Sequence, residues 1–250
     1  MATLYIAWRE LRSIFNTAIG WMVLCGFLLV NGVFWEIYLT NYVAQKAQLV
    51  FDPYGATSMG LTDYLIVPWF GNCAVILLFM APSLSMRLFA EEFKQRTMEL
   101  LFTSPVATIE IVMGKYLGAM SFVAIMLLCT VHVPASLYYW GEPEFGAVAG
   151  SYLGIFLMSA LLIAIGMFCS AMTTNQIVAL SMSFAGSLVL YVAGWAGQDP
   201  DSVLAHIGLA SHLEGMFSGA VKLSDLVYFG AGICLFIFAT HQRLESHRWS

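Results

Sequence analysis

The sequence predicts an all-α integral membrane protein with six transmembrane helices. Of its 250 residues, 60% are hydrophobic and 10% are charged, against roughly 25% charged residues in soluble domains. Mean hydropathy is +0.81. A helix needs about 20 predominantly apolar residues to cross a bilayer, because its backbone polar groups must be satisfied within the segment. The predicted spans are Ala18 to Leu39, Tyr64 to Met86, Tyr116 to Tyr139, Val148 to Ala171, Ile177 to Gly197 and Leu226 to Thr240.

The sixth of these spans is short, so it should tilt little or extend past His241. Residues 1–16, ahead of the first span, are predicted to form an amphipathic helix at the membrane interface. Its apolar residues recur at helical steps of four, three and four, while charged residues such as Arg9 and Arg12 lie on other faces. These apolar residues are Leu4, Trp8, Leu11 and Phe15. The alternative, in which this segment continues span one, stays open.

The positions of the cations predict that both termini are cytoplasmic. With that orientation, eight of the ten Lys and Arg residues lie inside and only Lys46 and Lys222 lie outside. The inner set is Arg9, Arg12, Arg87, Lys94, Arg96, Lys115, Arg243 and Arg248. The net charge of -5 argues against a nucleic-acid partner. We expect membrane lipids to surround the spans.

Residues 198–225 are predicted to be an external, partly apolar segment. They are too polar to span, but they could dip into the outer leaflet if other protein segments cover them. His206, His212 and Glu214 lie here, but their spacing lacks the H-E-x-x-H pattern and no further ligand is evident. No metal site is predicted.

Residues 87–115, between the second and third spans, form a predicted cytoplasmic region that is unusually rich in charge. A helix is expected to stop near Thr103-Ser104-Pro105, because proline disfavours helix in the residue before it. A second helix then starts, capped either by Ser104 with Pro105 in the first position or by Thr108 with Glu110 in the first turn. The pattern fits a docking site for a cytoplasmic partner as well as an ordinary solvated linker.

The stretch EEFKQRTMELLFTSPV, followed by IEIVMGK, resembles the cytoplasmic signature of type-2 ABC exporter permeases, closest to the gliding-motility and copper-enzyme-maturation permeases. Arg96 stands where many members have glycine, so a continuous helix is expected there instead of a bend. The positions that match are Glu91 or Glu92, Lys94, Thr97, Glu99, Leu100, Leu101, Thr103, Pro105, Glu110, Ile111, Val112, Gly114 and Lys115.

The resemblance implies a multi-pass permease subunit of the cell inner membrane, without catalytic activity, in which residues 87–115 form a coupling helix region. The chain has no G-x-x-x-x-G-K-[ST] loop, so a separate ATP-binding subunit would hold ATP and Mg, with no cofactor on this chain. A second permease copy or a relative would complete the pathway. The residues implied in coupling are Glu91, Glu92, Lys94, Arg96, Thr97, Glu99, Leu100, Leu101, Thr103, Pro105, Glu110 and Lys115.

Four polar residues inside the spans are candidates for a pathway or gate: Glu36, Asn31, Asn72 and His132. Glu36 near the interface and the two asparagines also fit structural roles, the asparagines as hydrogen-bond partners between helices. His132 with Pro134 could kink its helix. Two rival classes are an intramembrane enzyme using Ser187 with His132 and an ion-driven transporter, whose paired broken helices are not visible in the sequence.

Overall fold

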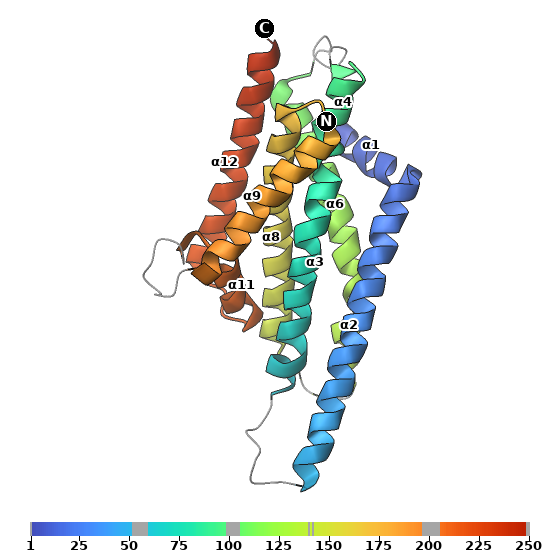
Figure 1. The fold of residues 1–250 in the computed structure, drawn as a ribbon, viewed down its shortest axis with the longest axis vertical. Helices are drawn as coiled ribbons and strands as arrows, with labels where there is room; N and C mark the ends of the chain where they lie inside the picture. Colours follow the sequence, from blue (N-terminus) through green and yellow to red (C-terminus); the bar gives the residue numbers. More distant parts are fainter. Residues whose placement is uncertain are drawn as a thin grey trace.

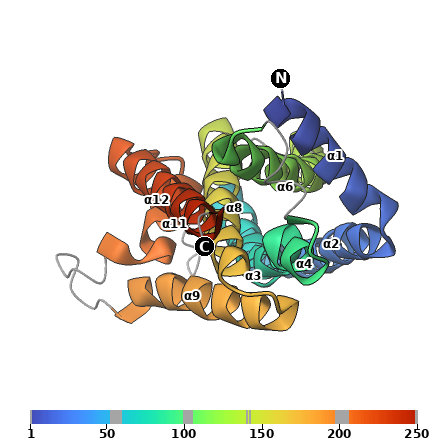
Figure 2. The same ribbon diagram turned by 90° about the horizontal axis from the view of Figure 1, so that it is seen from above.

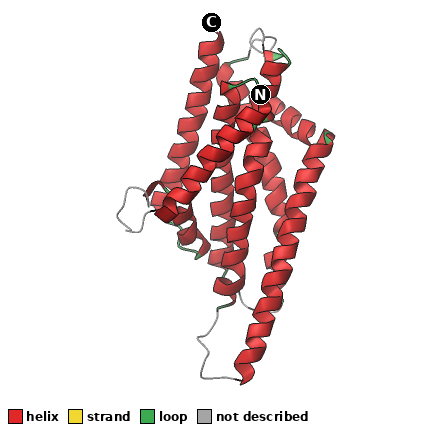
Figure 3. Ribbon diagram, in the orientation of Figure 1, coloured by secondary structure: helices red, strands yellow, loops and turns green. Residues whose placement is uncertain are grey.

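The computed structural model describes residues 2–51, 60–98, 106–139, 141, 143–196 and 206–248. Within these ranges every regular element is a helix (Figure 1, Figure 3). Six of the helical segments are long and apolar enough to cross a membrane. The predicted fold class, an all-α integral membrane protein with six spans, is therefore confirmed, and the chain is a multi-pass membrane protein.

Helix α8 (Phe145–Met172) forms the centre of the bundle. It carries no charged residue and is apolar around its circumference, which is typical of a helix buried on all sides. Viewed from above, it is surrounded by other long helices (Figure 2), and its contacts confirm that they pack against it. These are α3 (Val67–Ser85), α6 (Thr108–Thr130), α9 (Gln176–Ala196) and α12 (Leu223–Arg248).

Helix α2 (Ala18–Phe51) is longer than the first predicted span. The predicted end of the first span at Leu39 is wrong: the helix continues to Phe51, because no glycine or proline interrupts this stretch and its side chains find partners. Tyr42 is buried with its ring 6.0 Å from that of Tyr64, and Gln45 donates a hydrogen bond to the Tyr64 hydroxyl. Tyr64 belongs to the π-helix η1 (Thr62–Ile66), which leads directly into α3.

The sixth and third spans also differ from their predicted bounds. Helix α12 continues past His241 to Arg248, which removes the difficulty of a short span. The third span begins at Thr108 and is interrupted at Val131, where α6 ends and α7 (His132–Leu137) begins. Pro134 lies within α7 and cannot donate to the carbonyl four residues earlier, which accounts for a break at this point.

Helix α11 (Leu209–Phe217) lies within the predicted external segment 198–225 and packs against α8 and α9. Five of its nine residues are buried, so other protein segments cover its apolar face. His212 on α11 holds its Nδ1 2.7 Å from a carboxylate oxygen of Asp225, in the first turn of α12. Among the described residues, no group of three or more His, Cys, Asp or Glu side chains is arranged to hold a metal ion.

Helix α1 (Ala2–Asn16) runs across the bundle and ends before α2 begins, so it does not continue the first span (Figure 1). Its Leu4 and Trp8 side chains are 71% and 62% exposed, whereas Ile6 and Ile14 are buried, and the helix packs against α6. Both chain termini lie at the same end of the bundle as α1 and α4 (Arg87–Lys94). We call this the terminal end.

Candidate functional site

Helix α4 continues the line of α3 after a break at Met86, and the Ser170 side chain of α8 occupies this break. The Ser170 hydroxyl accepts hydrogen bonds from the backbone N–H groups of Phe89 (3.1 Å) and Ala90 (2.9 Å). It donates to the Met86 carbonyl at 2.8 Å. A side chain inserted into a helix ladder in this way fixes the angle between two helical segments. The orientation of α4 is therefore tied to α8.

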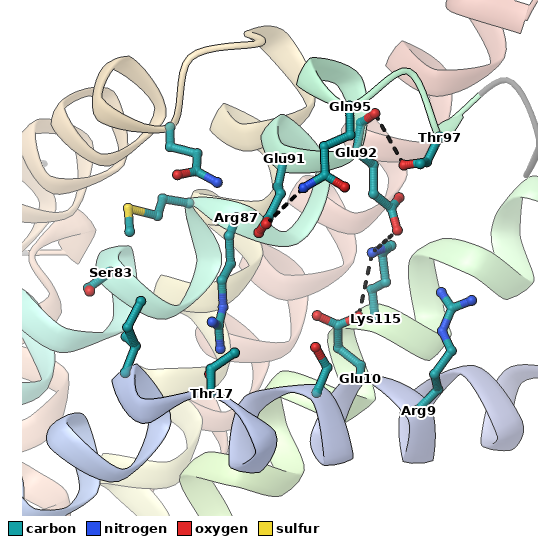
Figure 4. Close-up of a pocket in the computed structure, with 14 residues that line it drawn as sticks. Arg9, Glu10, Thr17, Ser83, Arg87, Glu91, Glu92, Gln95, Thr97 and Lys115 are labelled. Carbon is teal, nitrogen blue, oxygen red and sulfur yellow. Dashed lines mark hydrogen bonds and ion pairs between the residues drawn. The ribbon is translucent and has the colours of Figure 1, made fainter.

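Lys115, on α6, is the second tie between α4 and the bundle. Its side chain is only 2% exposed, and its Nζ lies 2.8 Å from a Glu92 carboxylate oxygen and 3.6 Å from one of Glu10 (Figure 4). The ammonium group also lies 5.4 Å from the centre of the Phe89 ring, within the range of a cation–π interaction. We call Lys115, Glu92 and Glu10 the Lys115 cluster. It joins three elements: α1, α4 and α6.

Small residues on α6 allow α1 to approach closely enough for Glu10 to join this cluster. A methyl group added at Gly118 would lie 2.7 Å from Cβ of Glu10, and one added at Gly114 would lie 2.7 Å from Cβ of Ile6. The two glycines are separated by three residues, the spacing that lets membrane helices pack with their backbones close together. Glu10 and Gly118 were not among the predicted site residues, although the G-x-x-x-G spacing of Gly114 and Gly118 was a usable signal.

The tip of α4 ends in a tight turn at Arg96, and the expected continuous helix through this position is wrong. Arg96 has φ 56°, in the left-handed region. Its N–H donates to the Phe93 carbonyl (3.3 Å), and the N–H of Thr97 donates to the Glu92 carbonyl (3.1 Å). These two bonds form a Schellman motif, which satisfies the last carbonyls of a helix and favours glycine at the left-handed residue. A bend is thus present here with arginine, at the position where the resemblance implied glycine.

Replacing Arg96 with glycine is expected to stabilise the protein. Relief of the left-handed penalty, offset by the larger freedom of glycine in the unfolded chain, should raise the free energy of unfolding by about 0.5–1 kcal/mol. Thermal unfolding of the purified chain in detergent measures the shift. Arg12→Gly is the matched control, because Arg12 lies exposed inside α1, where glycine should destabilise. A lower unfolding temperature for Arg96→Gly would contradict the prediction.

Of the two predicted caps, Ser104 with Pro105 lies outside the described residues, and Thr108 as the cap is wrong. Ala107 occupies the cap position, Thr108 is the first helical residue, and a Glu110 carboxylate oxygen accepts a hydrogen bond from the Ala107 N–H at 3.4 Å. Ala107 has no side-chain acceptor, so only the Glu110 half of a capping box is formed. The helix then leads through Lys115 into the third span, as predicted.

Apart from Glu110, in the first turn of α6, the implied coupling residues fall into three groups. Lys94 and Arg96 are exposed at the tip of α4, and Thr97 is half-buried beside it. Glu91 accepts a hydrogen bond from Gln95 at 3.2 Å, whereas Glu92 and Lys115 are directed inward in the Lys115 cluster. Five predicted residues lie outside the described ranges: Glu99, Leu100, Leu101, Thr103 and Pro105.

Both asparagines among the pathway candidates make hydrogen bonds between α2 and α3. The Asn31 side chain, 1% exposed, accepts from the Cys73 thiol at 2.6 Å, and its backbone carbonyl accepts from Trp69 at 3.2 Å. Asn72 donates to the Tyr38 hydroxyl at 2.6 Å. The interpretation of these asparagines as links between helices agrees with these contacts.

Glu36 and His132 are both exposed on the surface of the bundle. His132 Nδ1 lies 2.8 Å from the carbonyl of Cys129, in the last turn of α6. Ser187, the nucleophile of the enzyme alternative, is buried on α9, and its hydroxyl has no hydrogen-bond partner among the described residues. Among the described residues, no base lies within hydrogen-bonding distance of Ser187.

A comparison with curated proteins gave no match. The family profile described as "ABC-2 family transporter protein" matches residues 4–199, a range that includes the Lys115 cluster, Ser170 and the first five spans. This family consists of membrane components of ABC transporters, which in general work with ATP-binding subunits. The narrower resemblance to the gliding-motility and copper-enzyme-maturation permeases stays a prediction. The chain belongs to the ABC-2 transporter family and is a permease subunit of an ABC transporter.

Proposed function

We propose that this chain is the permease subunit of an exporter in the cell inner membrane, driven by a separate ATP-binding subunit that docks at the terminal end. The cations support an inward-facing terminal end, since α1, α4 and the last turns of α12 carry most of them. Docking would involve the exposed tip of α4 around Lys94 and Arg96.

The observation that carries this proposal is the double attachment of α4. The Lys115 cluster ties α4 to α1 and α6, and Ser170 ties it to α8 at the centre of the bundle. A displacement of the α4 tip therefore acts directly on two membrane-spanning helices. This is the arrangement needed for a docked subunit to change the packing of the spans.

In the proposed cycle, ATP and Mg are held by the partner subunit and this chain supplies no catalytic group. Closure of the ATP-bound subunits favours one arrangement of α4 over another, and the spans follow by a shift in population. A second permease copy or a relative lies opposite and completes the pathway. The work of this chain is conformational, and its bonds to the transported substrate are noncovalent.

Coexpression with the genomic neighbours, followed by mild detergent purification, tests the docking. We expect an ATP-binding subunit to copurify, and the double substitution Lys94→Glu with Arg96→Glu to reduce the copurified amount at least fivefold, because it reverses two charges on the docking surface. Lys46→Glu, an exposed cation on α2 at the opposite end, should have no effect. Equal recovery of the partner with both variants would contradict the proposed docking site.

A further inference from the structure

A cavity of about 530 Å³ opens at the terminal end between α1, the start of α2, the junction of α3 with α4, and the start of α9. Its charged lining residues divide equally into three cations and three carboxylates: Arg9, Arg87 and Lys115, and Glu10, Glu91 and Glu92. The formal charges cancel, but they are not evenly paired. The Lys115 cluster accounts for one cation and two carboxylates, and Glu91 is hydrogen-bonded to Gln95.

Two charged residues of the lining keep a buried atom without a hydrogen-bond partner among the described residues: Glu92, through the carboxylate oxygen Oε2, and Arg87. Arg87 is the cation of the two. Its side chain runs from α4 toward α1 and ends beside Thr17, away from the Lys115 cluster (Figure 4). Its Nη2 atom is buried and has no hydrogen-bond partner among the described residues. A guanidinium stays charged at any physiological pH, and burying one of its nitrogens without an acceptor is unfavourable. The position therefore requires an acceptor that the described part of the chain does not supply.

The other groups around Arg87 suit an anion with several oxygen atoms. Hydroxyls of Ser13, Thr17 and Ser83 and the amide of Gln176 line the cavity. A phosphate presents several acceptor oxygens, and the planar fork of an arginine can bind two of them. Beside the carboxylates that are already engaged by Lys115 and Gln95, the cavity thus combines a cation that lacks a partner with uncharged polar groups.

The surroundings favour a lipid as the source of this phosphate. Ile19 lines the cavity and is 53% exposed, and next to it on α2 Trp21 and Met22 are 53% and 71% exposed. Tryptophan beside a charged site marks the headgroup level of a bilayer, and the exposed apolar side chains of α2 would contact acyl chains below it. We propose that this cavity binds the phosphate of an anionic phospholipid headgroup, with Arg87 as the anchoring residue.

Native mass spectrometry of the purified full chain, after equilibration with a mixture of phosphatidylglycerol and phosphatidylcholine, tests the site. We expect one phosphatidylglycerol molecule to be retained per chain, retention to fall at least fivefold in Arg87→Gln, and Arg87→Lys to keep part of it. Arg12→Gln is the matched control: it removes an exposed cation of α1 that does not line the cavity. Its retention should change less than twofold.

Three outcomes would overturn the proposal. The first is equal retention in Arg87→Gln and Arg12→Gln, and the second is equal retention of both lipids by the unmodified chain. The third is displacement of phosphatidylglycerol by 10 mM inorganic phosphate, which would make free phosphate the ligand. The lipid competition on the unmodified chain decides the question even if Arg87→Gln does not fold. No ATP-binding subunit is needed, so the result is independent of the docking proposal.

Discussion

Replacing Lys115 with methionine is expected to lower the free energy of unfolding by about 3–5 kcal/mol, because removal of one member of a buried ion pair leaves uncompensated charge. Here two carboxylates, Glu92 and Glu10, would lose their cation; their side chains are only 17% and 14% exposed. Methionine keeps the length of the side chain, so little packing is lost. Thermal and chemical unfolding of the purified chain in detergent measures the change.

Two further variants separate the ion pair from general damage to the chain. Lys94→Met removes an exposed lysine of α4 and should change stability by less than about 0.5 kcal/mol. Adding Glu10→Gln and Glu92→Gln to Lys115→Met removes all three charges and should recover most of the loss, since a neutral cluster carries no buried charge. If Lys115→Met unfolds like Lys94→Met, the cluster does not hold α4 in place.

Replacing Ser170 with alanine is expected to weaken the attachment of α4 to α8. Transport-linked ATP turnover should fall by a larger factor than the amount of folded protein. The Phe89 and Ala90 N–H groups and the Met86 carbonyl would lose the hydroxyl, and each buried polar group left without a partner costs about 1–3 kcal/mol. The measurement is ATPase activity of the copurified complex alongside thermal unfolding of the same sample.

Ser159→Ala is the matched control for this substitution. Ser159 is also buried on α8, but its hydroxyl donates only to the Ile155 carbonyl of its own helix, at 2.7 Å. Loss of the Ser159 hydroxyl should lower the stability only slightly and should leave ATP turnover unchanged. Ser170→Thr keeps a hydroxyl and should retain part of the activity. Equal turnover in the Ser170→Ala and Ser159→Ala complexes would show that the bond between α4 and α8 has no role in coupling.

The six spans were predictable because a bilayer imposes length and composition on every helix that crosses it. The stretch after Leu39 was missed because its polar residues resemble a loop, whereas its helix is stabilised by contacts with η1 that only the tertiary structure shows. The bend at Arg96 was missed because a left-handed residue is usually glycine, and the hydrogen bonds that hold an arginine there are not encoded in residue type.

The candidate site was only partly predictable for a related reason. The charge density of residues 87–115 marked the region, but it did not distinguish exposed charges such as Lys94 from buried ones such as Lys115. That distinction depends on α1 returning to α6, a contact between segments far apart in the chain. The role of Ser170 had no signal in sequence, because a serine inside an apolar helix usually bonds to its own backbone, as Ser159 does.

The seating of α1 on α6 also has a consequence for how the chain is made. Glu10 cannot meet Lys115 until about a hundred further residues have been synthesised, which takes roughly 5–20 s at typical rates of translation. During that interval α1 lacks α6, the helix with which it makes most of its contacts. We expect its exposed Leu4 and Trp8 side chains to hold the nascent helix at the membrane surface, beside the place where α6 will be inserted.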